Sequence, residues 1–131
     1  LIDTVWRDVI FSNCKMLGLG FDVCNKFGLS FSFDGCSLAH STFHNTKIKN
    51  TVFKNTHLQE VDFSGCDLSG AVFDNCDLRN AAFDQTNLER ADFRTAYNYS
   101  IDPDSNKIKM ARFSISGVSG LLKKYNIEIE R

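Results

Sequence analysis

Residues 61–93 read VDFSGCDLSGAVFDNCDLRNAAFDQTNLERADF, and a large apolar side chain stands at every fifth position of this stretch. The same spacing extends without a gap back to residue 33. The recurring large residues are Phe33, Leu38, Phe43, Ile48, Phe53, Leu58, Phe63, Leu68, Phe73, Leu78, Phe83, Leu88 and Phe93. A run of this length is not a product of chance, so an internal repeat decides the fold.

A second position of the five-residue unit is also restricted, because a mostly small residue stands two places before each large one. These residues are Cys36, Ser41, Thr46, Thr51, Thr56, Cys66, Ala71, Cys76, Ala81, Thr86 and Ala91, with Phe31 and Val61 as larger exceptions. The other three positions are polar or charged in most units. Each unit therefore has two inward positions and three outward ones.

A period of five fits neither of the regular secondary structures. On an α-helix, every fifth residue steps by about 140° around the axis, so the large side chains would scatter over all faces. On a flat strand, successive fifth residues point to opposite sides. The spacing instead predicts a chain that turns a corner once per unit, so that every large side chain points toward a common axis.

The units VDFSG, CDLSG, CDLRN, TNLER and ADFRT resemble the pentapeptide-repeat family, whose unit is written A-[DN]-L-x-x. In that family four units make one square turn. The resemblance covers about residues 9–115 and implies an all-β fold, a right-handed quadrilateral β-helix of roughly five turns.

The alternation of Phe with Leu or Ile agrees with four units per turn, because like side chains then stack on like. Phe33, Phe53, Phe73 and Phe93 form one column, and Phe43, Phe63 and Phe83 form the opposite column. Leu38, Leu58 and Leu78 line the third face, and Ile48, Leu68 and Leu88 line the fourth. Adjacent turns would then lie about 4.8 Å apart and pair their backbone amides.

The repeat is interrupted once near each end. Upstream, the five-residue step of Phe11, Met16 and Phe21 is two residues out of phase with Phe33, which predicts a bulge near residues 22–32. Downstream, residues 97–106 contain turn-forming residues and the single proline, Pro103, which predicts a loop. Beyond the loop, Ile108 and Phe113 return to their columns. We therefore assign residues 1–115 to the β-helix.

Residues 116–131 have a different pattern, which predicts a terminal cap. Val118, Leu121, Leu122 and Tyr125 have the i, i+3, i+4, i+7 spacing of a short amphipathic helix. Ser116 is a candidate N-cap, and residues 127–130 (IEIE) alternate as in an edge strand. We expect the apolar helix face either to cover the open end of the β-helix or to form a dimer contact.

Composition excludes several functional classes. The 131 residues carry a net charge of −1, whereas nucleic-acid binders need an excess of cations. No apolar run is long enough to cross a membrane. Five cysteines without zinc-like spacing indicate free thiols and a cytoplasmic location. Because the chain begins at Leu1 without a signal peptide, we expect a segment of a longer protein.

The sequence offers no catalytic, cofactor or metal site. His44 and His57 are predicted to point outward on different faces, so they cannot converge on a metal ion. Cys36, Cys66 and Cys76 occupy the small inward position, where a thiol acts as an apolar filler. No order of residues typical of a nucleophile with its base stands out. We therefore expect a protein that is not an enzyme.

Acidic residues are concentrated in residues 60–93, which hold eight acids and two bases. Their densest set lies on two adjacent predicted faces and consists of Asp62, Asp67, Asp84 and Glu89. An acidic rod as wide as a duplex could imitate DNA, and some pentapeptide-repeat proteins bind DNA gyrase or topoisomerase IV in this way and protect it from quinolones. However, Asp before the central residue belongs to the repeat consensus, and Lys47 and Lys49 lie one turn away. A merely solvated surface is the competing interpretation.

Two functions of different scope therefore remain. The first is a non-enzymatic scaffold that presents flat polar faces to a protein partner. The second is a DNA mimic that binds gyrase or topoisomerase IV. In the resistance proteins of the family, dimers form through the C-terminal end, so Val118, Leu121, Leu122 and Tyr125 are candidates for a homodimer contact here. The small net charge and the lack of long projecting loops distinguish this chain from those proteins.

Overall fold

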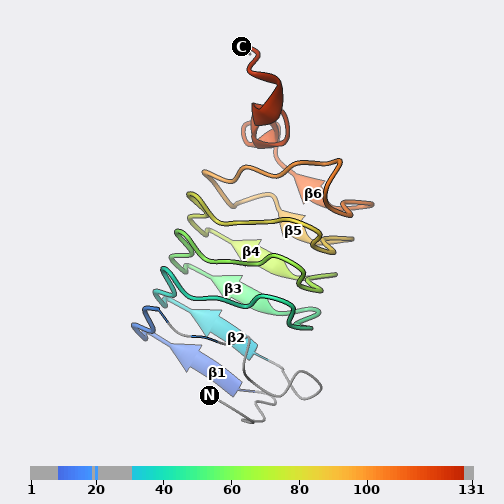
Figure 1. Ribbon diagram of the computed structural model, residues 1–131. Coiled ribbons are helices and arrows are strands. Elements are labelled where there is room, and N and C mark those ends of the chain that lie inside the picture. Colours follow the sequence, from blue (N-terminus) through green and yellow to red (C-terminus); the bar gives the residue numbers. More distant parts are fainter. Residues whose placement is uncertain (1–8, 19, 21–30, 129–131) are drawn as a thin grey trace.

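The computed structural model describes residues 9–18, 20 and 31–128, which wind into a β-solenoid of about five turns. Each turn contributes one short strand to a single parallel sheet, in which the strands stack in chain order (Figure 1). The strands are β1 (Val9–Ser12), β2 (Phe31–Asp34), β3 (Val52–Lys54), β4 (Val72–Asp74), β5 (Asp92–Phe93) and β6 (Arg112–Phe113). The all-β quadrilateral fold is confirmed.

The register between turns is twenty residues, as the alternation of Phe and Leu predicts. Phe33 pairs with Phe53 and Phe53 with Phe73 in the sheet. On the other three faces, isolated parallel bridges join His57 to Asp77, Asp62 to Ala82 and Lys47 to Asp67. Backbone N–H groups of one coil thus donate to carbonyls of the next on all four sides.

Five-residue units end in a left-handed backbone corner. The residue two places after each central residue has a positive φ throughout residues 35–90. These corner residues are Gly35, His40, Asn45, Asn50, Asn55, Glu60, Gly65, Gly70, Asn75, Asn80, Gln85 and Arg90. Gly and Asn, which adopt this conformation at least cost, occupy most of the corners. At Gly65 a Cβ would lie 2.0 Å from Asn45 Oδ1, so any larger residue there would displace the Asn45 side chain.

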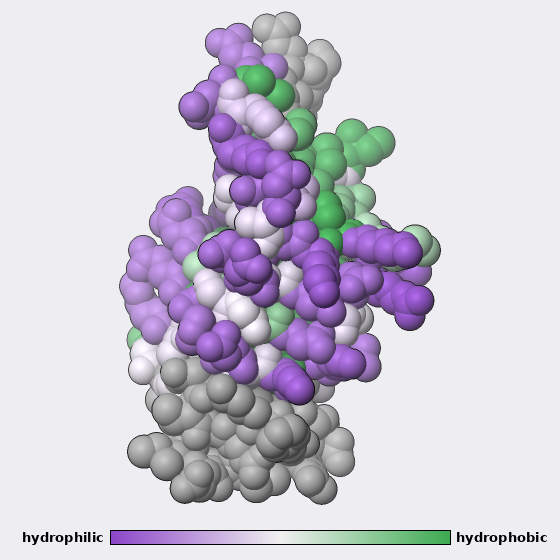
Figure 2. All heavy atoms as spheres, turned by 45° about the vertical axis from the view of Figure 1, so that its right-hand side comes forward, coloured by the Kyte–Doolittle hydropathy of each residue, from purple (hydrophilic) through white to green (hydrophobic). Residues whose placement is uncertain are grey.

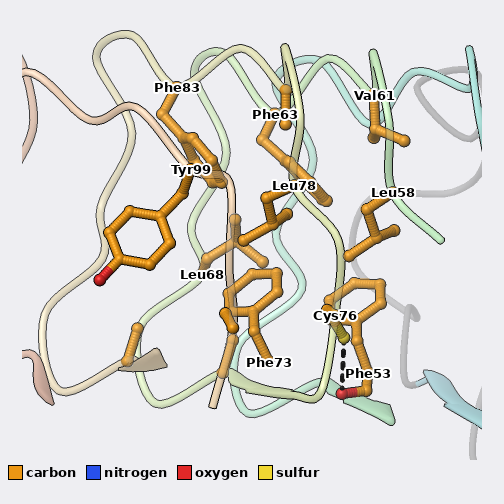
Figure 3. Close-up of a cluster of buried hydrophobic side chains, with 14 of the residues drawn as sticks. Phe53, Leu58, Val61, Phe63, Leu68, Phe73, Cys76, Leu78, Phe83 and Tyr99 are labelled. Atoms are coloured by element: carbon orange, nitrogen blue, oxygen red, sulfur yellow. Dashed lines mark hydrogen bonds between the residues drawn. The ribbon is translucent and has the colours of Figure 1, made fainter. Parts of the chain in front are cut away.

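Two columns of phenylalanine rings fill the interior. In the first column, the ring centroids of Phe53 and Phe73 are 5.1 Å apart and nearly parallel. In the opposite column, Phe63 and Phe83 stack at 5.3 Å. The two columns meet edge to face, with the Phe63 and Phe73 rings 6.0 Å apart at 82°, and Leu58, Leu68 and Leu78 complete the core (Figure 3). Both arrangements are favourable geometries for aromatic pairs.

The small inward position holds hydrogen-bond donors as well as apolar groups. The Thr86 hydroxyl donates to the Phe63 carbonyl oxygen at 2.8 Å, and the Cys76 thiol donates to the Phe53 carbonyl oxygen at 3.2 Å (Figure 3). These carbonyls belong to the preceding coil. The backbone therefore satisfies the buried hydroxyls and thiols at this position, so Thr, Cys and Ala can all occupy it.

Both predicted interruptions are consistent with the register. Phe11 pairs with Phe33, which is an offset of 22 residues, and Gly20 pairs with Thr42 at the same offset. The offset is 20 from Ser32 onward, so the two additional residues fall between Gly20 and Ser32. Residues 21–30, which include Phe21 and most of the predicted bulge, lie outside the described residues. Downstream, Phe113 stacks on Phe93 at 5.3 Å, so the phase returns after the loop without loss.

The short C-terminal helix predicted from the apolar spacing is present as 3-10 turns rather than as a continuous α-helix. It forms two 3-10 turns, η2 (Val118–Leu121) and η3 (Lys123–Tyr125), and Gly117 takes the N-cap position predicted for Ser116. Gly120 lies against the last coil, where a Cβ would come within 2.4 Å of the Tyr99 carbonyl oxygen. This close approach requires glycine, and glycine weakens a helix.

Two further findings concern the predicted edge strand and membrane-spanning helices. Ile127 and Glu128 form no strand, contrary to the predicted edge strand, and its remaining residues lie outside the described range. No helix in residues 9–18, 20 and 31–128 has the length and apolarity needed to span a membrane.

Removal of one ring tests the stacked core. Phe73→Ala should lower the free energy of unfolding by about 3–5 kcal/mol, because it opens a void between two neighbouring coils. Phe113→Ala is the matched control, since Phe113 is only half-buried at the end of the same column and should cost clearly less. Urea unfolding followed by circular dichroism gives both values. A loss below about 1 kcal/mol for Phe73→Ala would contradict a stacked interior.

Candidate interaction surfaces

The four acidic residues singled out from the sequence lie on two adjacent faces of the solenoid. Asp62 and Asp84 flank the buried Phe63 and Phe83, whereas Asp67 and Glu89 flank the leucines of the next face. Asp84 is exposed, and the other three are half-buried. The structure therefore brings these carboxylates to one side of the rod but not into one cluster.

Two of these carboxylates also stabilise the local backbone. Asp62 Oδ1 accepts a hydrogen bond from the Ser64 N–H at 2.9 Å. Asp67 Oδ1 accepts one from the Ser69 N–H at 3.2 Å and another from the Ser69 hydroxyl at 2.9 Å. Asp at the position before the central residue thus satisfies a donor at the corner, which is the local turn chemistry expected of Asp. This structural role accounts for part of the acidic excess.

Lysines interrupt the acidic surface above and below. Lys49 Nζ lies 3.7 Å from Asp67 Oδ2. A hollow of about 400 Å³ follows the edge between the two faces, and both acidic and basic residues line it, including Lys47, Asp67 and Lys107. The electrostatic potential of these two faces is therefore mixed in sign, whereas that of a DNA backbone is continuously negative.

The loop after residue 97 carries a core residue that the repeat could not indicate. Position 98, which continues the column of Leu38, Leu58 and Leu78, is Asn, and the neighbouring Tyr99 fills the interior instead. Its ring centroid lies 5.6 Å from Phe93 and 5.8 Å from Phe113, and its hydroxyl points away from the leucine and phenylalanine columns (Figure 3). Burial raises the pKa of this phenol.

Lys124 attaches the terminal turns to that loop. Its ammonium group lies 2.9 Å from Asp102 Oδ1 and also contacts Asp104. The carboxylates of Asp104 and Asp102 raise the pKa of Lys124, and the Lys124 ammonium holds the pKa of Asp102 below its ordinary value. Lys124 and Asp104 are exposed and Asp102 is half-buried, so the contact contributes orientation more than stability.

The predicted C-terminal contact residues differ in exposure. Leu121 packs against the core and covers the end of the columns, and Leu122 is half-buried. Val118 and Tyr125 are 40% and 53% exposed. Figure 2 shows hydrophobic atoms gathered toward the C-terminal end, beside coils whose visible surface is largely hydrophilic. The segment therefore caps the solenoid, and exposed apolar side chains, of which Ile115 at 95% is the most exposed, remain at this end.

The candidate chemical groups are dispersed or buried. His40, His44 and His57 are exposed, and His40 Nδ1 contacts Glu60 at 2.8 Å. Among the described residues no set of three His, Cys, Asp or Glu side chains is placed to hold a metal. Burial raises the pKa of the Cys66 thiol to about 11 and that of Cys76 to about 12, which opposes formation of the reactive thiolate.

Comparison with known proteins gives the class of this fold. A family model described as the pentapeptide repeat region matches residues 26–93, slightly more than half of the chain. The chain belongs to the pentapeptide repeat family. A search of curated proteins found no match.

Solved structures share the solenoid at low sequence identity. A trypsin-treated variant of QnrB1, a plasmid-mediated fluoroquinolone resistance protein, superimposes with a TM-score of 0.61 at 15% identity over 99% of this chain and 62% of that chain. A pentapeptide repeat protein from the thylakoid lumen of Arabidopsis thaliana gives 0.53 at 16% identity, over 76% and 65%. This chain thus spans less than two thirds of either protein. At such identities the likeness establishes the fold alone.

The buried thiols should make stability sensitive to alkaline pH. The pKa of Cys76 is raised in the fold, so the unfolded chain ionises first, and the free energy of unfolding is unaffected well below about pH 9 and falls as the pH rises from about 9 toward 12. Cys76→Ala should reduce this fall, and Ala96 shows that alanine fits the same slot one coil later. Urea unfolding at several pH values measures the difference. A pH-independent difference between the wild type and Cys76→Ala would contradict the buried, neutral thiol.

Proposed function

We propose that the chain is a non-enzymatic interaction scaffold that presents polar faces to a protein partner. The observation that carries this proposal is the ladder of hydrogen bonds between coils on all four sides. It fixes the outward side chains in rows at a regular spacing. A surface that is already ordered loses little conformational entropy when it binds, which favours recognition by flat faces.

The dispersed chemistry of the molecule supports a role without catalysis. A nucleophile needs a neighbouring base and an accessible position. The thiols of Cys66 and Cys76 are buried with raised pKa values, and His44 and His57 stand on different faces. Free buried thiols also support a reducing location, so we place this scaffold in the cytoplasm.

Site-specific crosslinking tests the scaffold. A photoreactive amino acid replaces one exposed residue on each face, at Lys54, Arg79, Asp84 or Lys49, in otherwise identical chains. After irradiation in native lysate, one face or two adjacent faces should crosslink a defined protein, and the others should not. Mass spectrometry identifies the adduct. Equal and unspecific labelling from all four positions, or none from any, contradicts the proposal.

A narrower alternative is that this partner is DNA gyrase or topoisomerase IV, bound through Asp62, Asp67, Asp84 and Glu89 as a mimic of DNA. The outward placement of these carboxylates on one side of a rod supports it. The nearby Lys47, Lys49 and Lys107 weaken it, because they neutralise part of the negative field. The scaffold is therefore the broader and better supported function.

Gyrase supercoiling in the presence of a quinolone tests this alternative. The wild-type chain should preserve supercoiling, and reversal of Asp62, Asp67, Asp84 and Glu89 to lysine should abolish the protection. Reversal to lysine of four aspartates on the two other faces, Asp34, Asp74, Asp77 and Asp92, makes the same change in net charge and should leave the protection intact. Absence of protection by the wild type ends the gyrase role without affecting the scaffold.

The apolar patch at the C-terminal end supports a contact there. Val118 and Tyr125 are available for a homodimer, whereas Leu121 is already used to cap the core. We propose that the exposed pair mediates self-association through the C-terminal end.

A further inference from the structure

The outer surface of the β1–β6 sheet, termed the strand face, carries two rows of side chains. Both rows flank the buried phenylalanines, as the exposed, buried, exposed pattern of β3 shows. The row before the phenylalanines is Ile10, Ser32, Val52, Val72, Asp92 and Arg112. The row after them is Ser12, Asp34, Lys54, Asp74, Arg94 and Ser114.

The second row alternates in charge from coil to coil. Asp34 is in register with Lys54, and Lys54 is in register with Asp74. Arg94 follows one coil later, so the order along the solenoid axis is negative, positive, negative, positive. Read in the opposite direction, the order is positive, negative, positive, negative. The row is therefore complementary to its own reverse.

The first row is apolar at its centre. Val52 is 37% exposed, and Val72, its neighbour in the ladder, is half-buried. Ser32 and Asp92 lie on either side of this pair and can donate and accept a hydrogen bond respectively. An apolar centre with polar flanks is the usual composition of a protein interface.

We propose that the strand face binds a second copy of this chain, face to face, about a two-fold axis parallel to the strands. This axis reverses the order of the coils and keeps each row opposite its own copy. Val52 then lies opposite Val72 of the second copy. Asp34 lies opposite Arg94 of the second copy, and Lys54 lies opposite Asp74.

A dimer with its two-fold axis along the solenoid does not match opposite charges and apolar side chains in this way. A two-fold axis along the solenoid would place each row opposite the other row, so that Val52 would face Lys54 and Val72 would face Asp74 of the second copy. Charged groups would then be desolvated against valine, which is costly. Only the axis along the strands joins opposite charges and buries valine against valine.

The hydrogen bond between Asp92 and Arg94 within the chain does not prevent Arg94 from binding Asp34 of the second copy. Asp92 and Arg94 already form a pair within the chain, with Arg94 Nη2 2.9 Å from Asp92 Oδ2, and this bond lowers the pKa of Asp92. The Arg94 side chain nevertheless remains 56% exposed. A guanidinium group has five donors and can bind a second carboxylate, that of Asp34 across the interface.

The size of the strand face sets the expected affinity. Six strands at a spacing of about 4.8 Å form a face about 24 Å long, and strands of this length make it about 10 Å wide. This area is well below the roughly 800 Å² per partner of a standard stable interface. The dimer should therefore be weak, reversible and sensitive to salt.

Rescue by mixing two variants tests the arrangement. Lys54→Glu places two carboxylates opposite each other in the dimer, and Asp74→Lys places two ammonium groups opposite each other, so each variant alone should associate at least about tenfold more weakly than the wild type. Mixed together, the two variants pair opposite charges at both symmetry-related positions and should recover near wild-type affinity. Sedimentation velocity over a concentration series measures all three. Because the rescue acts between chains, improved folding of either chain cannot produce it.

Two control variants locate the contact. Lys49→Glu makes the same charge change on a different face and should not alter association. Val118→Glu alters the exposed C-terminal patch and should leave the rescue intact. A wild-type chain that stays monomeric at millimolar concentration overturns the proposal. In chains that also carry Val118→Glu, which alters the proposed C-terminal contact, a dimer that tolerates Lys54→Glu and Asp74→Lys also overturns the proposal, as do variants that fail to associate when mixed.

Discussion

The stacking of phenylalanine rings on hydrogen-bonded coils is the interaction on which the structure depends. Parallel strands set a spacing of about 4.8 Å, and ring centroids within the columns lie 4.8–5.4 Å apart. One distance therefore satisfies both the backbone amides and the aromatic offset stacks. A slip of one unit would place Phe on Leu and lose both the stacks and the edge-to-face contacts between columns. The interior thus specifies the twenty-residue register.

Most of the coil could be predicted from the sequence because each inward position repeats with one kind of side chain. The order of large residues also predicted the first coil, because Phe11 pairs with Phe33 at the 22-residue offset that the shifted step of Phe11 and Met16 indicates. The cap could not be predicted in the same way. Its shape depends on the single contact of Gly120 with Tyr99, and the apolar spacing of residues 118–125 also fits a helix.

The candidate surface was only partly predictable. The sequence places Asp62, Asp67, Asp84 and Glu89 on two faces, but it does not reveal the contact of Asp67 with Lys49. That contact depends on the side-chain conformation, which no repeat specifies. The left-handed corners were a missed signal. The preference for Gly and Asn at every fifth position was present in the sequence and identifies the backbone turns directly.

The separation of inward from outward positions has a consequence for function. Outward residues other than the left-handed corners and the turn-stabilising aspartates are not needed for the columns or the turns, so their identity changes the surface with little effect on the fold. The same register that stacks Phe53 on Phe73 aligns Lys54 with Asp74 and sets every outward row at steps of twenty residues. The alternating charges of the strand face and the acidic side chains interrupted by lysines on other faces can therefore vary independently, because the same core supports both. Specificity in such a scaffold is contained in the order of side chains along the axis, and the shape of the coil supplies only their spacing.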